Sequence, residues 1–182
     1  MNRLFLMRNP YVFQGEKYIN KNKNYFEGWY FKNTNKEDTI CFIPGINLED
    51  GNKKAFIQVI TNDSSYFVNY HINDFDFEYS PFNVKIGNNF FSKDIVNIDI
   101  RDDIQNLKIY GSLKYSNNKN IKTNFLKPNI MGPFSYIPFM ECNHGILSMK
   151  NNIEGLININ NKIIEFKDGL RIYRKRLGIF FS

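Results

Sequence analysis

Residues 107–115 have the sequence LKIYGSLKY, in which apolar and polar side chains alternate. Leu107, Ile109, Leu113 and Tyr115 fall on one side of the alternation, and Lys108, Ser112 and Lys114 fall on the other. Successive side chains of an extended strand point to opposite faces of a sheet, so a period of two indicates a strand with one buried face. This stretch therefore predicts a long strand with an apolar inner side.

Shorter runs of the same kind occur along most of the chain, separated by Asn, Asp, Gly and Pro. Residues 153–158 and 162–166 flank Ile159-Asn160-Asn161, and asparagine tolerates the positive φ of a tight hairpin turn. No window combines a helical stripe with a cap and a stop, which predicts very little helix. We expect an all-β antiparallel barrel or sandwich. The other predicted strands cover residues 39–46, 55–61, 66–72, 75–79, 82–86 and 95–100.

The composition agrees with this fold class. The chain has 182 residues, which suits one domain, and 42% of them are hydrophobic and 16% aromatic. Phe and Tyr favour strands, whereas Ala, the best helix former, occurs only at position 55. We therefore expect one ordered β-domain with a large aromatic core.

The net charge of +6 does not indicate nucleic-acid binding. Four of the positive charges come from Arg171, Arg174, Lys175 and Arg176, in a segment with no acidic residue after Asp168. Elsewhere lysines are interleaved with acidic residues, as on an ordinary solvated surface. The chain also contains no signal peptide pattern and no run of eighteen apolar residues. We expect a cytoplasmic protein with no nucleic-acid partner and no transmembrane segment.

Metal and nucleotide chemistry have no recognisable motif in this sequence. There is no zinc-ligand spacing, phosphate-binding loop or dinucleotide-binding glycine pattern, and His71 and His144 are the only histidines. We therefore expect neither a metal site nor a cofactor.

Glu27 is a candidate acid because its neighbours Tyr25, Phe26, Trp29 and Tyr30 are aromatic. A carboxyl group among aromatic rings is costly to ionise, so it could act as a general acid near neutral pH. Strand alternation equally allows Glu27 to lie on the outer face and pair with a lysine.

Glu141 and His144 form a second candidate pair. They lie three positions apart around a turn-prone Asn-His-Gly, and a carboxylate that holds one imidazole tautomer is a common device for moving protons. The alternative is a structural histidine bonded to a backbone carbonyl. Residues 127–140, which precede the pair, are rich in Pro and aromatic residues, and could form either a plug that fills one end of the fold or a lid over it.

Two stretches resemble the tocopherol cyclase family. YFEGWYFK (residues 25–32) resembles the family's opening motif, and members also carry an upstream Pro and Gly like those in NPYVFQG (residues 9–15). PNIMGPFSYIPFMECNHGILSMKNNIEGLININNKIIEF (residues 128–166) is similar to the family's proline-rich loop, Met-Glu-Cys step, His-Gly strand and closing hairpin. The resemblance covers most of the chain and implies an N-terminal segment, residues 1–24, and a lipocalin-like β-domain, residues 25–169.

The last residues depart from the family pattern. In the family a GYIEKDWG motif and a second β-domain follow, whereas residues 169–182 here have the sequence GLRIYRKRLGIFFS. One permitted codon choice from Arg171 onward encodes GYIEKDWGFSF when it is translated one base later. We therefore predict that residues 170–182 are a frameshifted tail that replaces the rest of a two-domain chain, which sequencing the gene would test.

The resemblance also implies a chemistry, the redox-neutral ring closure of a prenylated quinol. An acid protonates the prenyl double bond, and the phenol oxygen attacks the tertiary cation inside a water-free cavity. On this hypothesis Glu141 or Glu27 donates the proton and His144 is its partner. The apolar ligand-binding wall would comprise Trp29, Tyr30, Phe134, Tyr136, Phe139 and Met140.

Three functions remain open from the sequence: such an isomerase, a lipocalin-like carrier that binds a quinone or lipid without turnover, and an inactive truncated fragment. A fragment would self-associate through its uncovered domain interface. For the first two, we expect a location at the periphery of the membranes that hold the ligand.

Overall fold

The computed structural model describes residues 13–19, 24–49, 51–116, 142–148 and 152–179. These residues form strands almost throughout, with one four-residue helix and one 3-10 turn. No helix within the described ranges is long and apolar enough to cross a membrane. In chain order the elements are α2 (Glu16–Ile19), β1 (Tyr25–Thr34), β2 (Thr39–Glu49), β3 (Asn52–Ile60), β4 (Ser65–His71), η1 (Ile72–Asp74), β5 (Phe75–Tyr79), β6 (Phe82–Ile86), β7 (Asn89–Ser92), β8 (Ile95–Asp102), β9 (Leu107–Ser116), β10 (Cys142–Ser148), β11 (Asn152–Ile159) and β12 (Lys162–Ile179).

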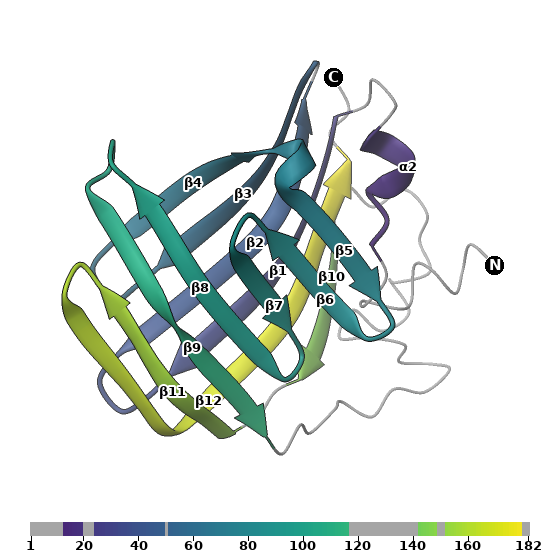
Figure 1. The fold of residues 1–182 in the computed structure, drawn as a ribbon. Coiled ribbons are helices and arrows are strands. Elements are labelled where there is room, and N and C mark those ends of the chain that lie inside the picture. The colour runs from purple at the N-terminus through teal and green to yellow at the C-terminus, as the bar shows by residue number, and fades with distance from the viewer. Residues whose placement is uncertain (1–12, 20–23, 50, 117–141, 149–151, 180–182) are drawn as a thin grey trace, which may run out of the picture.

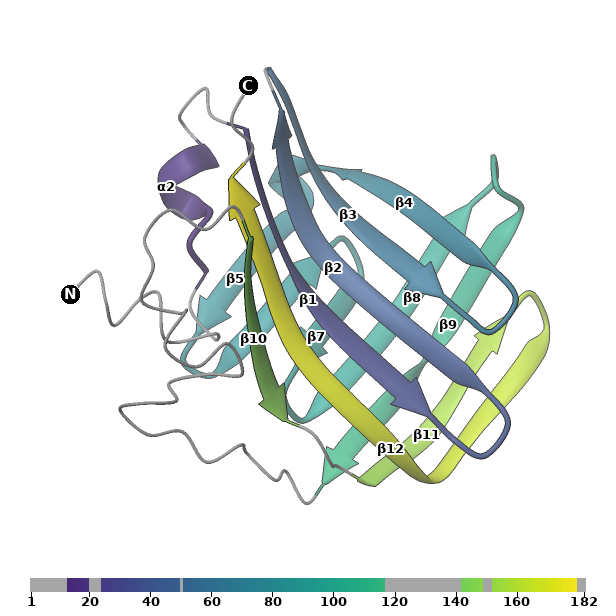
Figure 2. The ribbon, with the colours of Figure 1, turned by 180° about the vertical axis from the view of Figure 1, so that it is seen from behind.

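The described strands belong to one continuous antiparallel sheet. Its hydrogen-bonded order is β4-β3-β2-β1-β12-β11-β9-β8-β7-β6-β5, and β10 pairs with β12 off this path. The sheet curves over on itself, so that the half containing β1 to β4 faces the half containing β5 to β9 (Figures 1 and 2). The prediction of an all-β antiparallel fold with very little helix is therefore confirmed for the described residues.

The sheet is not closed into a barrel. A barrel was one of the two architectures predicted from the sequence. Its two end strands, β4 and β5, do not pair with each other, because η1 carries the chain from one to the other. Two side chains bridge from β4 to the opposite half. Gln105 Nε2 donates to the Phe67 carbonyl at 3.0 Å, and Asn89 Nδ2 donates to the Tyr70 hydroxyl at 3.3 Å. Side-chain hydrogen bonds from β7 and from the turn between β8 and β9 thus connect β4 to the opposite half of the sheet.

The hairpin predicted near the C-terminus is confirmed. β11 and β12 are joined through Asn160 and Asn161, whose φ angles are 47° and 72°. The Asn161 amide donates to Asn158 Oδ1 at 2.9 Å, and the Asn160 amide donates to the Lys108 carbonyl at 2.9 Å. The turn is therefore fixed both to its own hairpin and to β9.

The alternation of β9 also sets the core as predicted. Its inward residues Leu107, Ile109, Leu113 and Tyr115 are buried, and the lysines between them are exposed. Opposite strands supply large aromatic side chains to the same interior. The bulkiest fully buried side chains include Trp29, Tyr25, Phe31, Phe42, Phe91 and Phe166.

β12 is the longest strand, and it holds the two halves of the sheet together. Its first part pairs with β11, and its second part pairs with β10 on one side and with β1 on the other. The ladder with β1 runs from Thr34 opposite Leu170 to Tyr25 opposite Ile179. The strand therefore passes without a break through position 170, where the predicted tail begins. The frameshift itself stays a prediction.

Candidate functional site

Glu27 lies on the inward face of β1. The strand buries alternate residues, and Tyr25, Glu27 and Trp29 all point inward. The Glu27 side chain is 0% exposed. The interpretation that placed Glu27 on the outer face beside a lysine is therefore wrong, because the alternation runs the other way.

Among the described residues, Gln14, Gly15 and Tyr25 donate hydrogen bonds to the Glu27 carboxylate. The Gln14 amide lies 3.2 Å from Oε1 and 2.9 Å from Oε2, and the Gly15 amide lies 2.8 Å from Oε2. The Tyr25 hydroxyl donates to Oε2 at 2.5 Å. Hydrogen bonds to a charged acceptor are about twice as strong as neutral ones. The carboxylate thus anchors the chain segment that precedes β1.

Tyr25 is the partner of this carboxylate within β1. Its side chain is 1% exposed. Burial, followed by the negative charge of Glu27 and the hydrogen bond to it, raises the pKa of Tyr25 far above the ordinary tyrosine value. The phenol therefore keeps its proton and serves as a hydrogen-bond donor inside the fold.

We expect the free energy of unfolding to fall as the pH rises above the ordinary tyrosine pKa of 10.0. The unfolded chain then releases the Tyr25 proton while the folded chain retains it, so the contribution is complete below that pKa and is lost above it. The loss is about 1.4 kcal/mol per pH unit for this one group. Urea denaturation across this pH range checks this loss.

The control is needed because burial also raises the pKa of Tyr70. Tyr70 therefore contributes its own loss of stability above the ordinary tyrosine pKa, in the wild type and in Tyr25 variants alike. Tyr25→Phe should therefore lose less stability than the wild type, and an equal loss would contradict the assignment.

Trp29 lies at the centre of an aromatic cluster that we define as Phe13, Trp29, Phe75, Phe77 and Phe82. Trp29 stacks on Phe77 and Phe75, with ring centroids 5.4 Å and 6.4 Å away. Phe82 and Phe13 approach it at tilted angles, 6.0 Å and 6.2 Å away. β1 thus meets β5 and β6 from the opposite half of the sheet through these rings.

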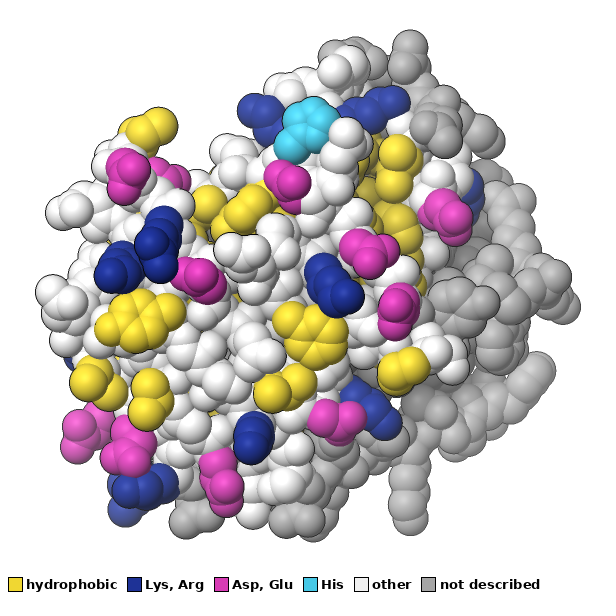
Figure 3. Space-filling model, in the orientation of Figure 1, with side chains coloured by type: hydrophobic (Ala, Val, Ile, Leu, Met, Phe, Trp, Pro, Cys, Tyr) yellow, Lys and Arg dark blue, Asp and Glu magenta, His cyan; other side chains and the backbone are white. Residues whose placement is uncertain are grey.

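The aromatic cluster is only partly closed to solvent. Trp29 is fully buried, whereas Phe13, Phe75 and Phe77 are half-buried. Figure 3 shows hydrophobic side chains gathered in a hollow at one end of the fold. The hollow lies between η1 and β5 on one side and α2 on the other. The cluster therefore presents apolar rings at one end of the fold, close to a buried carboxylate.

Tyr30 and Trp29 do not face the same space. They are neighbours in β1, and alternation puts the half-buried Tyr30 on the opposite face of the sheet from Trp29. The two residues were predicted to line one ligand wall, but the structure does not bring them together.

His144 lies in β10, level with Gly28 of β1. Gly28 pairs with Arg176 in β12, and Arg176 pairs with His144 in β10. Because neighbouring strands lie about 4.8 Å apart, the backbones of Gly28 and His144 are separated by about 10 Å. The backbone register places Asn143, and not His144, level with Glu27, through Leu177 of β12. The Glu27 and His144 partnership stays a prediction.

The remaining predicted site residues fall outside the described residues, and so does the segment 127–140 that was predicted to be a plug or a lid. Their roles stay predictions. These residues are Glu141, Phe134, Tyr136, Phe139 and Met140.

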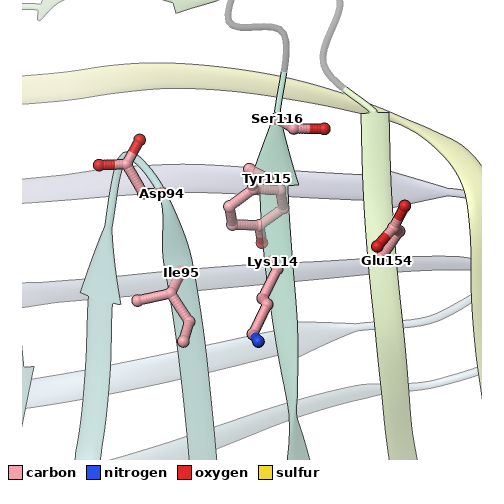
Figure 4. Close-up of a pocket in the computed structure, with 6 residues that line it drawn as sticks. All are labelled: Asp94, Ile95, Lys114, Tyr115, Ser116 and Glu154. Carbon is pink, nitrogen blue, oxygen red and sulfur yellow. The ribbon is translucent and has the colours of Figure 1, made fainter.

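A separate pocket of about 410 Å³ lies where β8, β9 and β11 meet (Figure 4). Lys114 pairs across the sheet with Glu154 and Ile95, and both charged side chains are exposed. Tyr115 adds a buried ring whose hydroxyl donates to Asn33 Oδ1 at 3.0 Å. This pocket could not be recognised in the sequence, because its charged residues look like any solvated strand face. Its lining residues are Asp94, Ile95, Lys114, Tyr115, Ser116 and Glu154.

Within the part of the chain that the structure describes, no group of three or more His, Cys, Asp or Glu side chains could hold a metal ion. Among the described residues, we therefore take Glu27, its hydrogen-bond partners and the aromatic cluster as the candidate functional site. No protein-family model matches this chain, and no curated protein matches it.

Proposed function

We propose that this chain is the N-terminal β-domain of a tocopherol cyclase-like protein and that it binds a hydrophobic ligand at the aromatic cluster. The observation that carries the proposal is the pair of half-buried rings, Phe75 and Phe77, stacked on a fully buried Trp29. Apolar sites with a few convergent polar groups are typical of small-molecule binding. A prenylated quinol, a related isoprenoid or a lipid fits this chemistry.

The ligand would gain from apolar contact with these rings. Each methylene group that leaves water contributes about 0.8 kcal/mol, so a prenyl chain is a favourable occupant. The quinol ring can stack on the aromatic side chains, and its hydroxyl groups can meet the polar atoms around Glu27. On this proposal the protein is cytoplasmic and works at the periphery of the membranes that hold its ligand.

Titration with a short-chain prenylquinone, monitored by the fluorescence of Trp29, tests the proposal. Trp29 is the only tryptophan in the chain, so quenching reports contact at the cluster alone. We expect saturable quenching. Phe77→Ala should raise the dissociation constant by about 3- to 10-fold, because it removes an aromatic partner.

Leu156→Ala is the matched control, because Leu156 is 50% exposed on the outer face of β11. It should leave the dissociation constant unchanged. Quenching that never saturates, or an equal effect of the two variants, would show that the ligand does not bind at the cluster.

Acid-catalysed ring closure is the second candidate function, because a buried carboxyl group, Glu27, lies on the same face of β1 as Trp29. Glu27 accepts hydrogen bonds from Gln14, Gly15 and Tyr25 in this structure, so it would have to take up a proton before it could donate one. Protonation of the prenyl double bond would create a tertiary cation beside aromatic faces, which stabilise positive charge. The phenol oxygen then forms the new C–O bond and its proton returns to the conjugate base, so no oxidant or reductant is consumed. Glu141 and His144 are the alternative proton donor and partner.

Chromatographic detection of the cyclised product separates catalysis from binding. If Glu141 is the proton donor, Glu141→Gln should abolish the product and leave Trp29 quenching intact. Unchanged turnover would remove Glu141 from the mechanism and leave Glu27 as the candidate. An inactive fragment would instead give no product in any variant and would self-associate through its uncovered interface.

A further inference from the structure

Residues 13–19, which we call the strap, lie across the end of the fold where the aromatic cluster opens. The strap comprises Phe13, Gln14, Gly15 and α2. Figures 1 and 2 both show α2 outside the sheet, beside the start of β1 and the end of β12. None of the described strands pairs with the strap. Its attachment therefore depends on side chains of the body of the protein.

The strap contacts the body of the protein through aromatic and polar groups, and Ile19 also packs against the core. Phe13 packs in the cluster, with its ring centroid 5.1 Å from Phe75 and 5.3 Å from Phe77. The Gln14 and Gly15 amides donate to the Glu27 carboxylate. In α2, the Tyr18 ring lies 4.5 Å from that of Tyr25. The hydrogen bonds to Glu27 thus form a polar contact between two aromatic contacts, and we call Glu27 the anchor of the strap.

Phe13 occupies the place that a ligand ring would take. It belongs to the strap and not to the sheet, yet it contacts Trp29, Phe75 and Phe77 at ring-stacking distances. The other cluster members lie on the strands β1, β5 and β6. A ring carried on a short attached segment can leave its site by local opening, which costs less than global unfolding.

We propose that the strap is a gate, with Phe13 as an internal occupant of the ligand site and Glu27 as the anchor that holds the gate closed. A hydrophobic ligand reaches Trp29 when the strap moves aside and Phe13 gives up its place. The identity of the site as a ligand site rests on the proposed function, whereas the opening of the strap does not.

The anchor also accounts for the burial of a carboxylate beside aromatic rings. Burial of a carboxylate without hydrogen-bond donors is strongly unfavourable, and the closed strap contributes two backbone donors, the Gln14 and Gly15 amides. When the strap leaves, water takes the place of these two donors, while the Tyr25 hydroxyl stays hydrogen-bonded to the carboxylate.

Amide hydrogen exchange at Gln14 and Gly15 tests the gate without any ligand. Glu27→Gln should accelerate exchange of these two amides by about 10- to 100-fold, because it weakens charge-assisted hydrogen bonds. Tyr115→Phe is the matched control, since it removes a buried tyrosine hydrogen bond at Asn33, away from the strap. Equal exchange in the two variants would overturn the gate. If Glu27→Gln does not fold, Phe13→Ala opens the gate from the strap side and should have the same effect.

The sign of the Phe13 effect on binding tests the internal occupant. Phe13→Ala should tighten binding of the short-chain prenylquinone by about 3- to 10-fold, because the ligand no longer has to displace an aromatic ring. Phe77→Ala should weaken binding instead. If Phe13→Ala also weakens binding, Phe13 is a ligand contact and the gate is wrong. If no variant binds the quinone while amide exchange still responds to Glu27→Gln, the proposed function fails and the opening of the strap stands.

Discussion

A chain that ends at Gly169 does not fold into the native sheet. The truncation removes the part of β12 that pairs with the whole of β1, from Leu170 opposite Thr34 to Ile179 opposite Tyr25. It also removes the strand against which β10 pairs. Each backbone hydrogen bond contributes about 1 kcal/mol net. Domains have only about 5–15 kcal/mol of stability, so a ladder of this length decides whether the protein folds.

Circular dichroism during urea denaturation checks this expectation. The truncated chain should show no cooperative transition, whereas a control chain that ends at Ile179 should unfold like the full chain because it keeps the entire ladder. A cooperative transition of unchanged midpoint after truncation at Gly169 would contradict the place of β12 between the two halves. The result does not depend on whether the codons of this segment are frameshifted.

Trp29→Ala should lower the free energy of unfolding by about 3–5 kcal/mol. The side chain is fully buried, and the rings that pack against it among the described residues come from two strands of the opposite half and from the strap. Truncation to alanine removes a large apolar surface and leaves a cavity between the neighbouring rings, next to the ladder that pairs Trp29 with Lys175 of β12. The aromatic cluster therefore stabilises the fold as well as forming the candidate site.

Urea denaturation followed by far-ultraviolet circular dichroism measures this loss without a tryptophan signal. Tyr110→Ala is the matched control, because Tyr110 is an aromatic residue that is 42% exposed on β9. Its cost should stay within about 0.5 kcal/mol. Equal costs for the two variants would mean that Trp29 is not at the centre of a packed cluster.

The strands and hairpin could be predicted because their signals are local. The period of two in β9 and the asparagine pair at 160–161 each act within a few residues. The long ladder of β12 with β1 could not be predicted, because it joins segments that lie far apart in the sequence. Three consecutive basic residues, Arg174, Lys175 and Arg176, interrupt the alternation in the second part of β12, so no local signal indicates that the strand extends to Ile179.

The inward orientation of Glu27 could not be predicted from alternation alone. Both faces of β1 carry aromatic residues, with Tyr25 and Trp29 on one side and Phe26 and Tyr30 on the other. Hydrophobicity therefore gives no preference for either face. The cluster around Trp29 combines rings from the strap, β1, β5 and β6, and such a long-range meeting point follows only from the curvature of the sheet.

Photolabelling with a diazirine-bearing prenylquinone tests most directly whether a hydrophobic ligand lies at the aromatic cluster. Mass spectrometry of the digested protein should find the label on peptides that contain Trp29, Phe75 or Phe77, and excess unlabelled prenylquinone should suppress it. Label confined to the exposed outer residues Leu156 and Ile163, and insensitive to competition, would contradict the proposed site.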